Sequence, residues 1–350
     1  MKKKIIHIVE AFGGGVFSVL TDLMNNTADE YDVTVLYGIR PQTPKDISKY
    51  LSDKVNVIPI EDFTSNINII KDIKAILKVR KYIKQLKPDV IHLHSSKAGA
   101  IGRIATSHKK VKILYSPHGF AFLKTDISSI HRRIYYLIEK ALAHITKMTI
   151  IACSKSEYKI ALKLTKSVVL LESSIDINRI DKVKCDESKK NGNLRICTVG
   201  RIEKQKNPEL FNMIAKELPE NQFTWIGDGK LKEKLNAKNI EITGWKEPKE
   251  TIELLNNNDV FILTSLWEGL PISLLEAMYL RKICIISSEI EGIDVIKNNV
   301  NGYIAKNDKE YVKIISNLGN ENVSEMAYND VKNKYNIKEY IKKYQKIINN

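Results

Sequence analysis

The chain has 350 residues, of which 43% are hydrophobic and 28% charged, proportions typical of a globular protein with two domains of ordinary size. No apolar run approaches the ~18–20 residues needed to cross a bilayer, and the apolar stretch after the N-terminal lysines is too short for a signal peptide. Four cysteines without paired spacing indicate reduced thiols in a cytosolic protein.

The net charge of +15 is concentrated in the first half of the chain. Residues 1–180 hold 29 Lys and Arg against 16 Asp and Glu, whereas residues 181–350 hold 27 against 25. This asymmetry predicts an anionic partner for the first half, such as a membrane leaflet, a lipid diphosphate or a nucleic acid. A lysine-rich proteome would explain the abundance of lysine but not its uneven distribution.

Strand-like and helix-like segments alternate along the chain, which predicts an α/β fold with parallel sheets covered by helices. In the first half we expect strands at 5–9, 32–36, 55–60, 90–93, 112–116, 148–152 and 168–171. Between them we expect helices at 16–26, 67–86, 97–108, 127–146 and 155–164.

A charged, polar segment at 181–193 follows, and its composition predicts a linker or an exposed loop. The alternation then resumes, with strands expected near 195–199, 222–226, 240–243, 260–264 and 283–287. Helices are expected at 208–218, after Pro271, at 306–318 and within 321–350. We therefore predict one domain at 1–180 and a second at 181–334.

Two glutamates, Glu268 and Glu276, flank the turn from a buried strand into a helix. Gly269 permits unusual backbone angles, Leu270 follows it, and Pro271 suits the first helical position. Ligands bind at the carboxyl edge of such sheets. Carboxylates accept hydrogen bonds from hydroxyls, and the free N–H groups of a helix N-terminus suit a phosphate. The segment therefore predicts a sugar-nucleotide site.

A second constellation follows the strand at 195–199. Gly200 lets the chain turn sharply at the strand exit, and Arg201 and Lys206 precede the helix at 208–218. A guanidinium and an ammonium at a helix N-terminus predict a diphosphate clamp. A solvated basic loop is the plain alternative in a lysine-rich chain.

Together these segments resemble the retaining glycosyltransferases of family 4, which have the GT-B fold. Glu268 and Glu276 match the Glu-x7-Glu signature, and Arg201 and Lys206 match the Gly-Arg-x4-Lys motif. The resemblance covers nearly the whole chain and is most specific between residues 195 and 305. It implies two doubly wound, Rossmann-like domains facing a cleft, with a helix at about 335–350 packed on the first, acceptor-side domain.

The resemblance also implies roles for single residues. Arg201 and Lys206 would hold the donor's diphosphate, Glu276 the ribose hydroxyls and Glu268 the transferring sugar. His118, which precedes a glycine at the end of a predicted strand, would contact a sugar hydroxyl or phosphate, although a surface or capping histidine is the plain alternative.

Several loops at the predicted sheet edges would contribute to the donor site. The family's glycine loop corresponds to Gly14 and Gly15, and loops bordering the nucleotide base correspond to Gly227, Asp228 and Trp245. For the latter, simple turns are the alternative.

The chain departs from the family at two places. Arg281 and Ile283 stand where Gly and Pro are usual after the signature helix, which changes a turn but touches no proposed ligand. Ser173-Ser174-Ile175-Asp176 replaces the usual Asn-Gly-Ile-Asp at the end of the first domain, so a hinge or backbone contact there is in doubt.

Histidines alternate on the strand at 90–93 and its continuation. His92 and His94 face the same side, but no third ligand presents itself, so a zinc site is not favoured. We expect His94 and Lys97 near the cleft, on the acceptor side.

The helix at 127–146 has an apolar stripe at helical spacing, with basic residues off that stripe. A basic amphipathic helix suits an anionic lipid surface, and a core-packed helix with solvated lysines is the other interpretation.

The sequence contains no Asp-x-Asp, the motif of metal-dependent transferases, so we expect no metal and no cofactor. The predicted reaction is retaining transfer of a sugar from a nucleotide sugar, UDP-sugar favoured and GDP-sugar the alternative. The expected acceptor is a polyprenyl-diphosphate-linked saccharide in capsule, O-antigen or exopolysaccharide assembly, at the inner face of the cell membrane. A nucleotide-sugar 2-epimerase of the same fold is a rival. A basic nucleic-acid-binding protein is another, although no recognised motif supports it.

Overall fold

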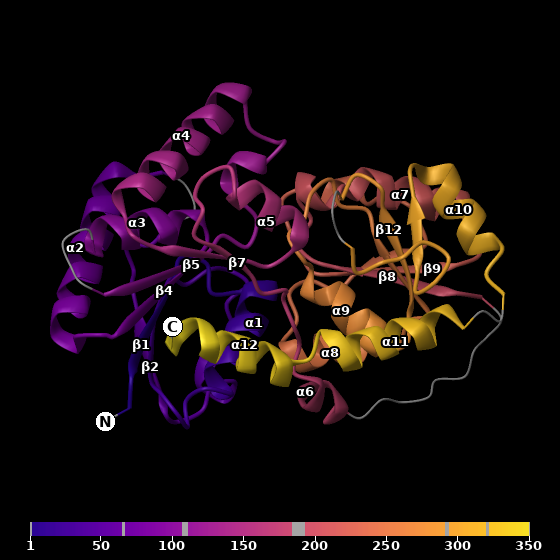
Figure 1. Ribbon diagram of the computed structural model, residues 1–350. Helices are drawn as coiled ribbons and strands as arrows, with labels where there is room; N and C mark the ends of the chain where they lie inside the picture. The colour runs from indigo at the N-terminus through magenta and orange to yellow at the C-terminus, as the bar shows by residue number, and fades with distance from the viewer. Residues whose placement is uncertain are drawn as a thin grey trace. The chain divides into compact units, whose positions relative to one another are not determined.

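The computed structural model describes residues 2–64, 67–106, 111–183, 193–290, 294–319 and 322–349. The chain folds into two compact units. In Figure 1, unit 1 is coloured from indigo to magenta, apart from its C-terminal helix in yellow, and unit 2 is coloured from rose to yellow. Unit 1 comprises Met1–Ser173 and Ile337–Asn350, and unit 2 comprises Ser174–Asn336. Residues 184–192, most of the predicted linker, lie outside the described residues.

The described residues of unit 1 form a seven-stranded parallel sheet in the order β3-β2-β1-β4-β5-β6-β7. The strands are β1 (Lys4–Val9), β2 (Asp32–Tyr37), β3 (Val55–Pro59), β4 (Val90–His94), β5 (Lys112–Ser116), β6 (Thr149–Ala152) and β7 (Val168–Leu170). Every strand predicted in this half is present, with ends that agree to within a residue. Most of these strands are apolar and buried because helices cover both faces of the sheet.

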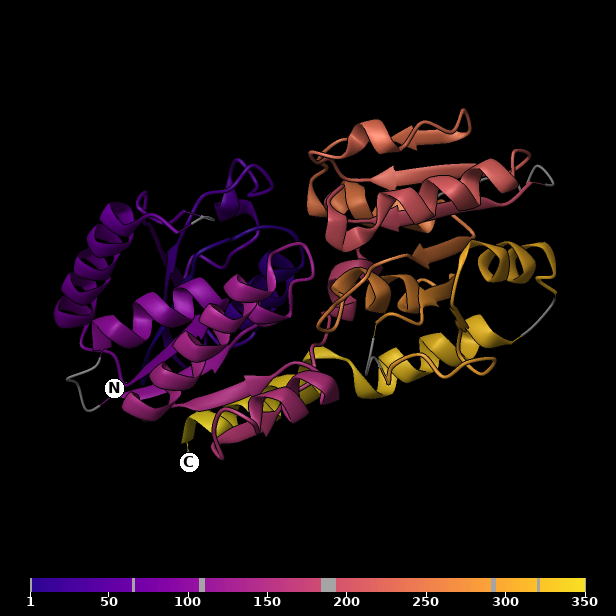
Figure 2. The same ribbon diagram turned by 90° about the horizontal axis from the view of Figure 1, so that it is seen from above.

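Two apolar cores lie on the two faces of this sheet, and Figures 1 and 2 show the helices that cover them. The helices are α1 (Gly14–Asn25), α2 (Ile69–Leu86), α3 (Ser96–Thr106), α4 (Ser129–Ile145), α5 (Lys155–Ala161) and α12 (Ile337–Asn349). Helices α1 and α12 bury their apolar sides in one core, whereas α2 and α3 contribute to the other. Helix α12 presents Ile337, Tyr340, Ile341, Tyr344 and Ile348, a helical spacing that places all five on one side.

An ion pair in unit 1 is almost entirely removed from water. Arg103 on α3 lies with Nη2 2.7 Å from Glu139 Oε2 on α4, and the Tyr115 hydroxyl donates to Glu139 Oε1 at 2.7 Å. Arg103 Nε also donates to the Gly99 carbonyl oxygen at 2.8 Å. These bonds satisfy both charged groups, which is what makes burying them tolerable.

The described residues of unit 2 form a six-stranded parallel sheet in the order β10-β9-β8-β11-β12-β13. The strands are β8 (Arg195–Val199), β9 (Gln222–Ile226), β10 (Ile240–Ile242), β11 (Val260–Leu263), β12 (Ile283–Ser287) and β13 (Tyr303–Ala305). The helices are α6 (Ile177–Asp181), α7 (Pro208–Glu217), α8 (Pro248–Asn256), α9 (Ile272–Tyr279), α10 (Asp308–Ser316) and α11 (Val323–Lys334). Elements β13, α6 and α8 were not predicted.

The two segments that join unit 2 to unit 1 lie side by side. Ile175 forms an isolated parallel bridge with Asn336, and its N–H donates to the Tyr335 carbonyl oxygen at 3.0 Å. Among the described residues, no helix combines the length and the apolarity needed to traverse a lipid bilayer.

The buried ion pair generates a prediction about stability. Arg103→Met should lower the free energy of unfolding by about 3–5 kcal/mol, because Glu139 would keep a buried charge without its partner. Urea denaturation followed by circular dichroism measures the change.

Two further variants separate the charge effect from lost packing. Lys54→Met removes an exposed ion pair with Asp29 and should leave the unfolding curve unchanged. Arg103→Met combined with Glu139→Gln removes both charges while keeping an acceptor for Tyr115, so it should regain part of the stability. A double variant as unstable as the single one would contradict this account.

Candidate functional site

Two loops at the carboxyl edge of the unit 2 sheet are joined by hydrogen bonds. The loop after β8 runs from Gly200 to Asn207, and the loop after β11 runs from Thr264 to Pro271. The Thr264 hydroxyl donates to the Lys206 carbonyl oxygen at 2.7 Å, and the Leu266 N–H donates to the Gln205 carbonyl oxygen at 2.8 Å. The two motifs recognised in the sequence are therefore fixed against each other.

Lys206 and Glu268 meet across these loops. Lys206 Nζ lies 2.8 Å from Glu268 Oε1, and the Ser265 hydroxyl donates to the same oxygen at 2.8 Å. Gln205 Nε2 donates to the Trp267 carbonyl oxygen at 3.1 Å and lies 3.4 Å from Glu268 Oε2. The carboxylate is thus held in place by groups on both loops, and its charge is balanced by an ammonium.

Arg201 lies apart from this pair. Its Nη1 is 3.2 Å from Glu203 Oε2, and its side chain is 48% exposed. The predicted clamp therefore brings Lys206 to the carboxylate of the second motif, while the guanidinium of Arg201 projects into solvent. Asn207 ends the loop in a left-handed conformation (φ 52°), and its side chain caps α7 by accepting from the Leu210 N–H.

Glu276 is the fifth of the eight residues of α9 and is buried. Its Oε1 lies 2.9 Å from Nη2 of Arg179 on α6, a partner that sequence reasoning missed. Helix α9 begins at Ile272, and Pro271 is its N-cap, so the prediction that Pro271 takes the first helical position was wrong by one residue. Between the two glutamates, Leu270 is buried and Gly269 is half-buried.

The glycines of unit 2 permit close backbone packing beside this site. Gly227 adopts φ 143°, and a Cβ added there would lie 2.1 Å from the Gly200 carbonyl oxygen. That oxygen accepts a hydrogen bond from Trp225 Nε1 at 2.9 Å. The Asp228 carbonyl oxygen accepts from the Ile202 N–H at 2.9 Å. The loop after β9 therefore depends on glycine to lie against the loop after β8.

Trp245 projects from the neighbouring loop after β10. The residue is 39% exposed, unusually high for a tryptophan in a folded domain. Gly244, the preceding residue, adopts φ 71° and pairs with Gly227 through an isolated antiparallel bridge. The exposed indole therefore stands at the same sheet edge as the two motif loops.

In unit 1, the glycine loop leads directly into α1. Gly13 is the N-cap, and Gly14 (φ 57°) and Gly15 form the first turn. Within the described ranges no side chain caps this end, so its first N–H groups are available to an anion. Gly13 has no room for a side chain, because an added Cβ would lie 2.5 Å from Gln42 Cγ.

His118 lies in the turn after β5 with a left-handed backbone (φ 51°). The following Gly119 donates its N–H to Glu157 Oε1 at 2.7 Å, and Glu157 Oε2 accepts from the Cys153 N–H at 2.8 Å. This buried carboxylate was not predicted, and it fixes the turn that carries His118. Burial raises the pKa of Glu157 and lowers that of His118 to about 4, so His118 is neutral at physiological pH.

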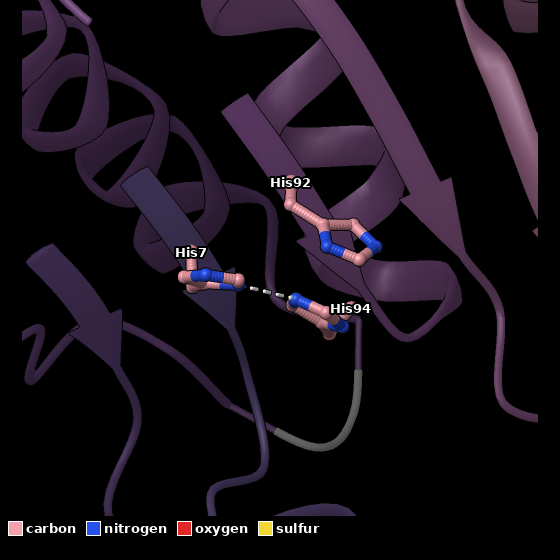
Figure 3. Close-up of side chains that lie close together, drawn as sticks. All are labelled: His7, His92 and His94. Atoms are coloured by element: carbon pink, nitrogen blue, oxygen red, sulfur yellow. Dashed lines mark hydrogen bonds between the residues drawn. The ribbon is translucent and has the colours of Figure 1, made fainter. Parts of the chain in front are cut away.

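Three histidines meet behind this turn, as Figure 3 shows: His7 on β1, and His92 and His94 on β4. Their potential ligand nitrogens all lie within 4.8 Å of one another. The premise that no third ligand accompanies His92 and His94 was therefore wrong, because parallel pairing of β1 with β4 brings His7 opposite His92.

The hydrogen bonds of these rings leave little for a metal ion. His92 Nδ1 lies 2.9 Å from the Tyr344 hydroxyl and its Nε2 2.9 Å from the Ser116 hydroxyl. His94 bonds to two other histidines and is buried, rather than open to solvent. Lys97, the other expected acceptor-side group, lies 2.9 Å from Asp72 Oδ1.

Comparison with known proteins identifies the family of this chain. The model of the group 1 glycosyl transferases matches residues 180–343, and the model of glycosyltransferase family 4 matches residues 13–178. An Escherichia coli protein, UDP-Gal:alpha-D-GlcNAc-diphosphoundecaprenol alpha-1,3-galactosyltransferase, is 31% identical over 284 residues, which cover 74% of this chain and 73% of that protein. The chain is a group 1 glycosyltransferase.

A further relative can be aligned with most of the glycosyltransferase. A Campylobacter jejuni alpha-1,4-N-acetyl-D-galactosaminyltransferase, named for a GalNAc-containing diphosphoundecaprenol acceptor, is 28% identical over 336 residues, or 91% of this chain and 89% of that protein. Family membership favours sugar transfer over the epimerase and nucleic-acid alternatives raised by the sequence.

Solved structures confirm the predicted fold class. Sucrose-phosphate synthase of Thermosynechococcus elongatus superposes with a TM-score of 0.83 at 14% identity, over 99% of this chain and 98% of that chain. HepE of Anabaena, solved in complex with UDP and glucose, gives 0.79 at 16% identity over 99% of both chains. The glycosyltransferase therefore has the two-domain α/β architecture of the GT-B fold.

The packing of Gly227 on Gly200 generates a prediction. Gly227→Ala should destabilise the glycosyltransferase by about 1–3 kcal/mol, because the added Cβ would strike a backbone carbonyl and φ 143° strains any side chain. Thermal unfolding measures the loss. Gly319→Ala is the control, since no atom of the described residues lies within 4 Å of its Cβ position. Equal losses in the two variants would refute the packing argument.

Proposed function

We propose that this glycosyltransferase moves a sugar from a UDP-sugar to a polyprenyl-diphosphate-linked saccharide, with retention at the anomeric carbon and without a metal ion. The observation that carries the proposal is the Lys206–Glu268 pair, which joins the two motif loops at the carboxyl edge of the unit 2 sheet. Its support comes from relatives named for diphosphoundecaprenol-linked acceptors and, in one case, for UDP-Gal.

The arrangement suits the departure of a nucleoside diphosphate. As the bond from the anomeric carbon to the diphosphate oxygen breaks, negative charge grows on the diphosphate. Lys206 lies beside the N-terminus of α7, where backbone N–H groups also favour an anion. In many enzymes, preorganised positive groups of this kind account for more of the rate enhancement than any other effect. Arg201, exposed on the same loop, has the reach to join them when the diphosphate binds.

The two glutamates would divide the donor between them. In the free protein Glu268 is paired with Lys206 and Glu276 with Arg179. Carboxylates held in this way are fixed acceptors for hydroxyls, so Glu276 would bind the ribose and Glu268 the transferring sugar. When Lys206 turns to the diphosphate, Ser265 and Gln205 still hold Glu268 in place.

A nucleotide titration tests the donor site. Calorimetry with UDP, GDP and their common sugars, in the presence of EDTA, should show micromolar binding of UDP and its sugars. Arg201→Ala combined with Lys206→Ala should weaken this binding at least a hundredfold, because charge-assisted contacts to a diphosphate contribute about 1.5–3 kcal/mol each.

Matched controls make this titration specific. Lys232→Ala and Lys234→Ala remove two charges from the short turn Lys232–Lys234 of the same unit, and should leave the affinity unchanged. Binding that requires added Mg²⁺ would overturn metal independence. Absent binding of every nucleotide to folded protein would remove the donor-site assignment, whereas tight GDP binding would correct the donor class alone.

The acceptor side of the proposal rests on one helical layer of unit 1. Helices α2, α3 and α4 cover the same face of its sheet (Figure 1). Their solvent side carries apolar residues that are largely exposed: Ile69, Ile70, Ile73 and Leu77 on α2, Ile104 on α3, and Ile130, Ile134, Leu137, Ile138 and Ile145 on α4.

The charges on these helices have one predominant sign. Helices α2 and α4 contain nine Lys and Arg but only two acidic residues, Asp72 and Glu139, and Glu139 is buried against Arg103. Exposed apolar residues among basic ones suit an anionic lipid surface. We therefore propose that this layer rests on the membrane that holds the acceptor. The interpretation of 127–146 as a core-packed helix was wrong for most of its apolar stripe, because Leu142 is buried but Ile130, Ile134, Leu137, Ile138 and Ile145 are exposed.

Vesicle flotation tests this surface. The protein should float with phosphatidylglycerol-containing vesicles at low salt and less with pure phosphatidylcholine. Ile130→Ser, Arg133→Gln and Leu137→Ser together should reduce the bound fraction several-fold, since each basic residue near such a surface contributes about 1 kcal/mol.

The control carries the same kinds of change on unit 2. Met213→Ser, Met326→Ser and Lys249→Gln alter two exposed apolar residues and one exposed lysine, and should leave flotation unchanged. The membrane-binding proposal would be refuted if the wild-type protein bound neither kind of vesicle. It would also be refuted if both triple variants lost the same fraction of bound protein.

A further inference from the structure

Three imidazoles in unit 1 form a continuous hydrogen-bonded chain that ends at His118. His7 Nδ1 lies 3.0 Å from His94 Nε2, and His94 Nδ1 lies 3.1 Å from His118 Nε2. The rings are nearly parallel, with centroids 5.3 and 5.4 Å apart and interplanar angles of 21° and 18°. Figure 3 shows the first of these bonds. We call His7, His94 and His118 the histidine chain.

The topology of the sheet builds this chain. His7 lies on β1, His94 ends β4, and His118 follows β5, and these three strands are neighbours in the sheet. Each ring therefore comes from the next strand along. His7 and His94 are fully shielded from water, whereas His118 is only half-buried. The histidine chain thus runs from the interior of unit 1 toward its surface.

Each imidazole of the histidine chain carries a proton on only one of its two nitrogens at physiological pH. Burial lowers the pKa of His7 to about 3 and that of His118 to about 4, and it lowers that of His94 as well. A neutral imidazole donates from one nitrogen and accepts at the other. The direction of the first hydrogen bond therefore dictates the direction of the second.

His7, at the buried end of the histidine chain, decides the direction of both hydrogen bonds. His7 Nε2 is buried and has no hydrogen-bond partner among the described residues. If the His7 proton lay there, a buried N–H would be orphaned, which folded proteins avoid more strictly than an unused acceptor. The proton therefore lies on Nδ1, from which His7 donates to His94, and His94 donates in turn to His118 Nε2.

We propose that His7 and His94 are positioning residues that fix His118 as the tautomer protonated on Nδ1. His118 Nε2 is then occupied as an acceptor, and Nδ1 becomes a hydrogen-bond donor aimed at an oxygen of the sugar ligand. The contact of His118 Nδ1 with the sugar ligand rests on the proposed function, whereas the tautomer of His118 is a property of unit 1 alone.

His92 provides the contrast that makes the inference testable. It is as buried as His94 and lies two residues before it on β4. Its nitrogens, however, bond to the hydroxyls of Tyr344 and Ser116 rather than to the chain. A structural disturbance should affect His92 and His94 variants alike, whereas loss of the tautomer should affect His94 variants only.

The experiment is long-range ¹H–¹⁵N NMR of protein labelled on its histidine rings, with the His118 signals assigned by His118→Gln. In the wild type His118 should be protonated on Nδ1. His94→Leu should release it to a mixture of tautomers. His94→Asn should restore the Nδ1 tautomer, because the amide nitrogen of asparagine stands where His94 Nδ1 was. His92→Leu should leave the His118 signals unchanged.

Activity gives a second reading once a donor has been found. His94→Leu should lower kcat roughly tenfold with little change in KM, since it weakens one hydrogen bond to the sugar. His94→Asn should recover most of this loss. His92→Leu should retain the wild-type kcat.

Several outcomes would overturn the proposal. They are a His118 ring protonated on Nε2, a His118 signal that is the same in His94→Leu as in the wild type, or tight uptake of one equivalent of Zn²⁺ with shifts at His7, His92 and His94. Uptake of Zn²⁺ with these shifts would show that the histidines form a metal site rather than the histidine chain. Because the tautomer is measured without any nucleotide, failure of the nucleotide titration would not be mistaken for failure of this proposal.

Discussion

The parallel direction of the unit 2 strands is the constraint on which the candidate donor site depends. Because β8, β9 and β11 run the same way, the loops that follow them open at one edge of the sheet. Lys206 and Glu268 are 62 positions apart in sequence, yet their charged atoms lie 2.8 Å apart. The glycines of the neighbouring loop allow it to pack on the same edge. The parallel strands thus bring the loops together, and only then can the side chains of those loops form the site.

Much of the fold could be predicted because its signals are local. Buried parallel strands are short apolar runs, and these runs located the strands of unit 1 to within a residue. Strand β13 (Tyr303–Ala305) was missed, although the equally short β7 and β10 were predicted. Helix α8 was missed although Pro248 lies in its first turn and Glu247 and Glu250 form a capping box, signals that mark a helix start without any apolar run.

The site was predictable in its motifs but not in its contacts. Glu276, Lys206 and His118 could be proposed because each belongs to a recognisable motif at or just after a turn. Arg179 and Glu157 were not, since nothing near them in sequence indicates the distant groups that they bind. His7 was hidden for a related reason, because one histidine inside an apolar strand gives no sign of the strand beside it. Such partners depend on sheet order, which periodicity does not specify.

The insertion of unit 2 into unit 1 has a consequence for synthesis. Unit 2 is one continuous stretch, whereas unit 1 obtains a wall of its core from α12, at the far end of the chain. Domains generally fold in the order in which they emerge from the ribosome. Here the part that emerges first must wait with one apolar sheet face covered by α1 but not yet by α12, and the inserted unit can be complete before it. His92, which bonds to the Tyr344 hydroxyl on α12, would gain that partner only after unit 2 has been synthesised.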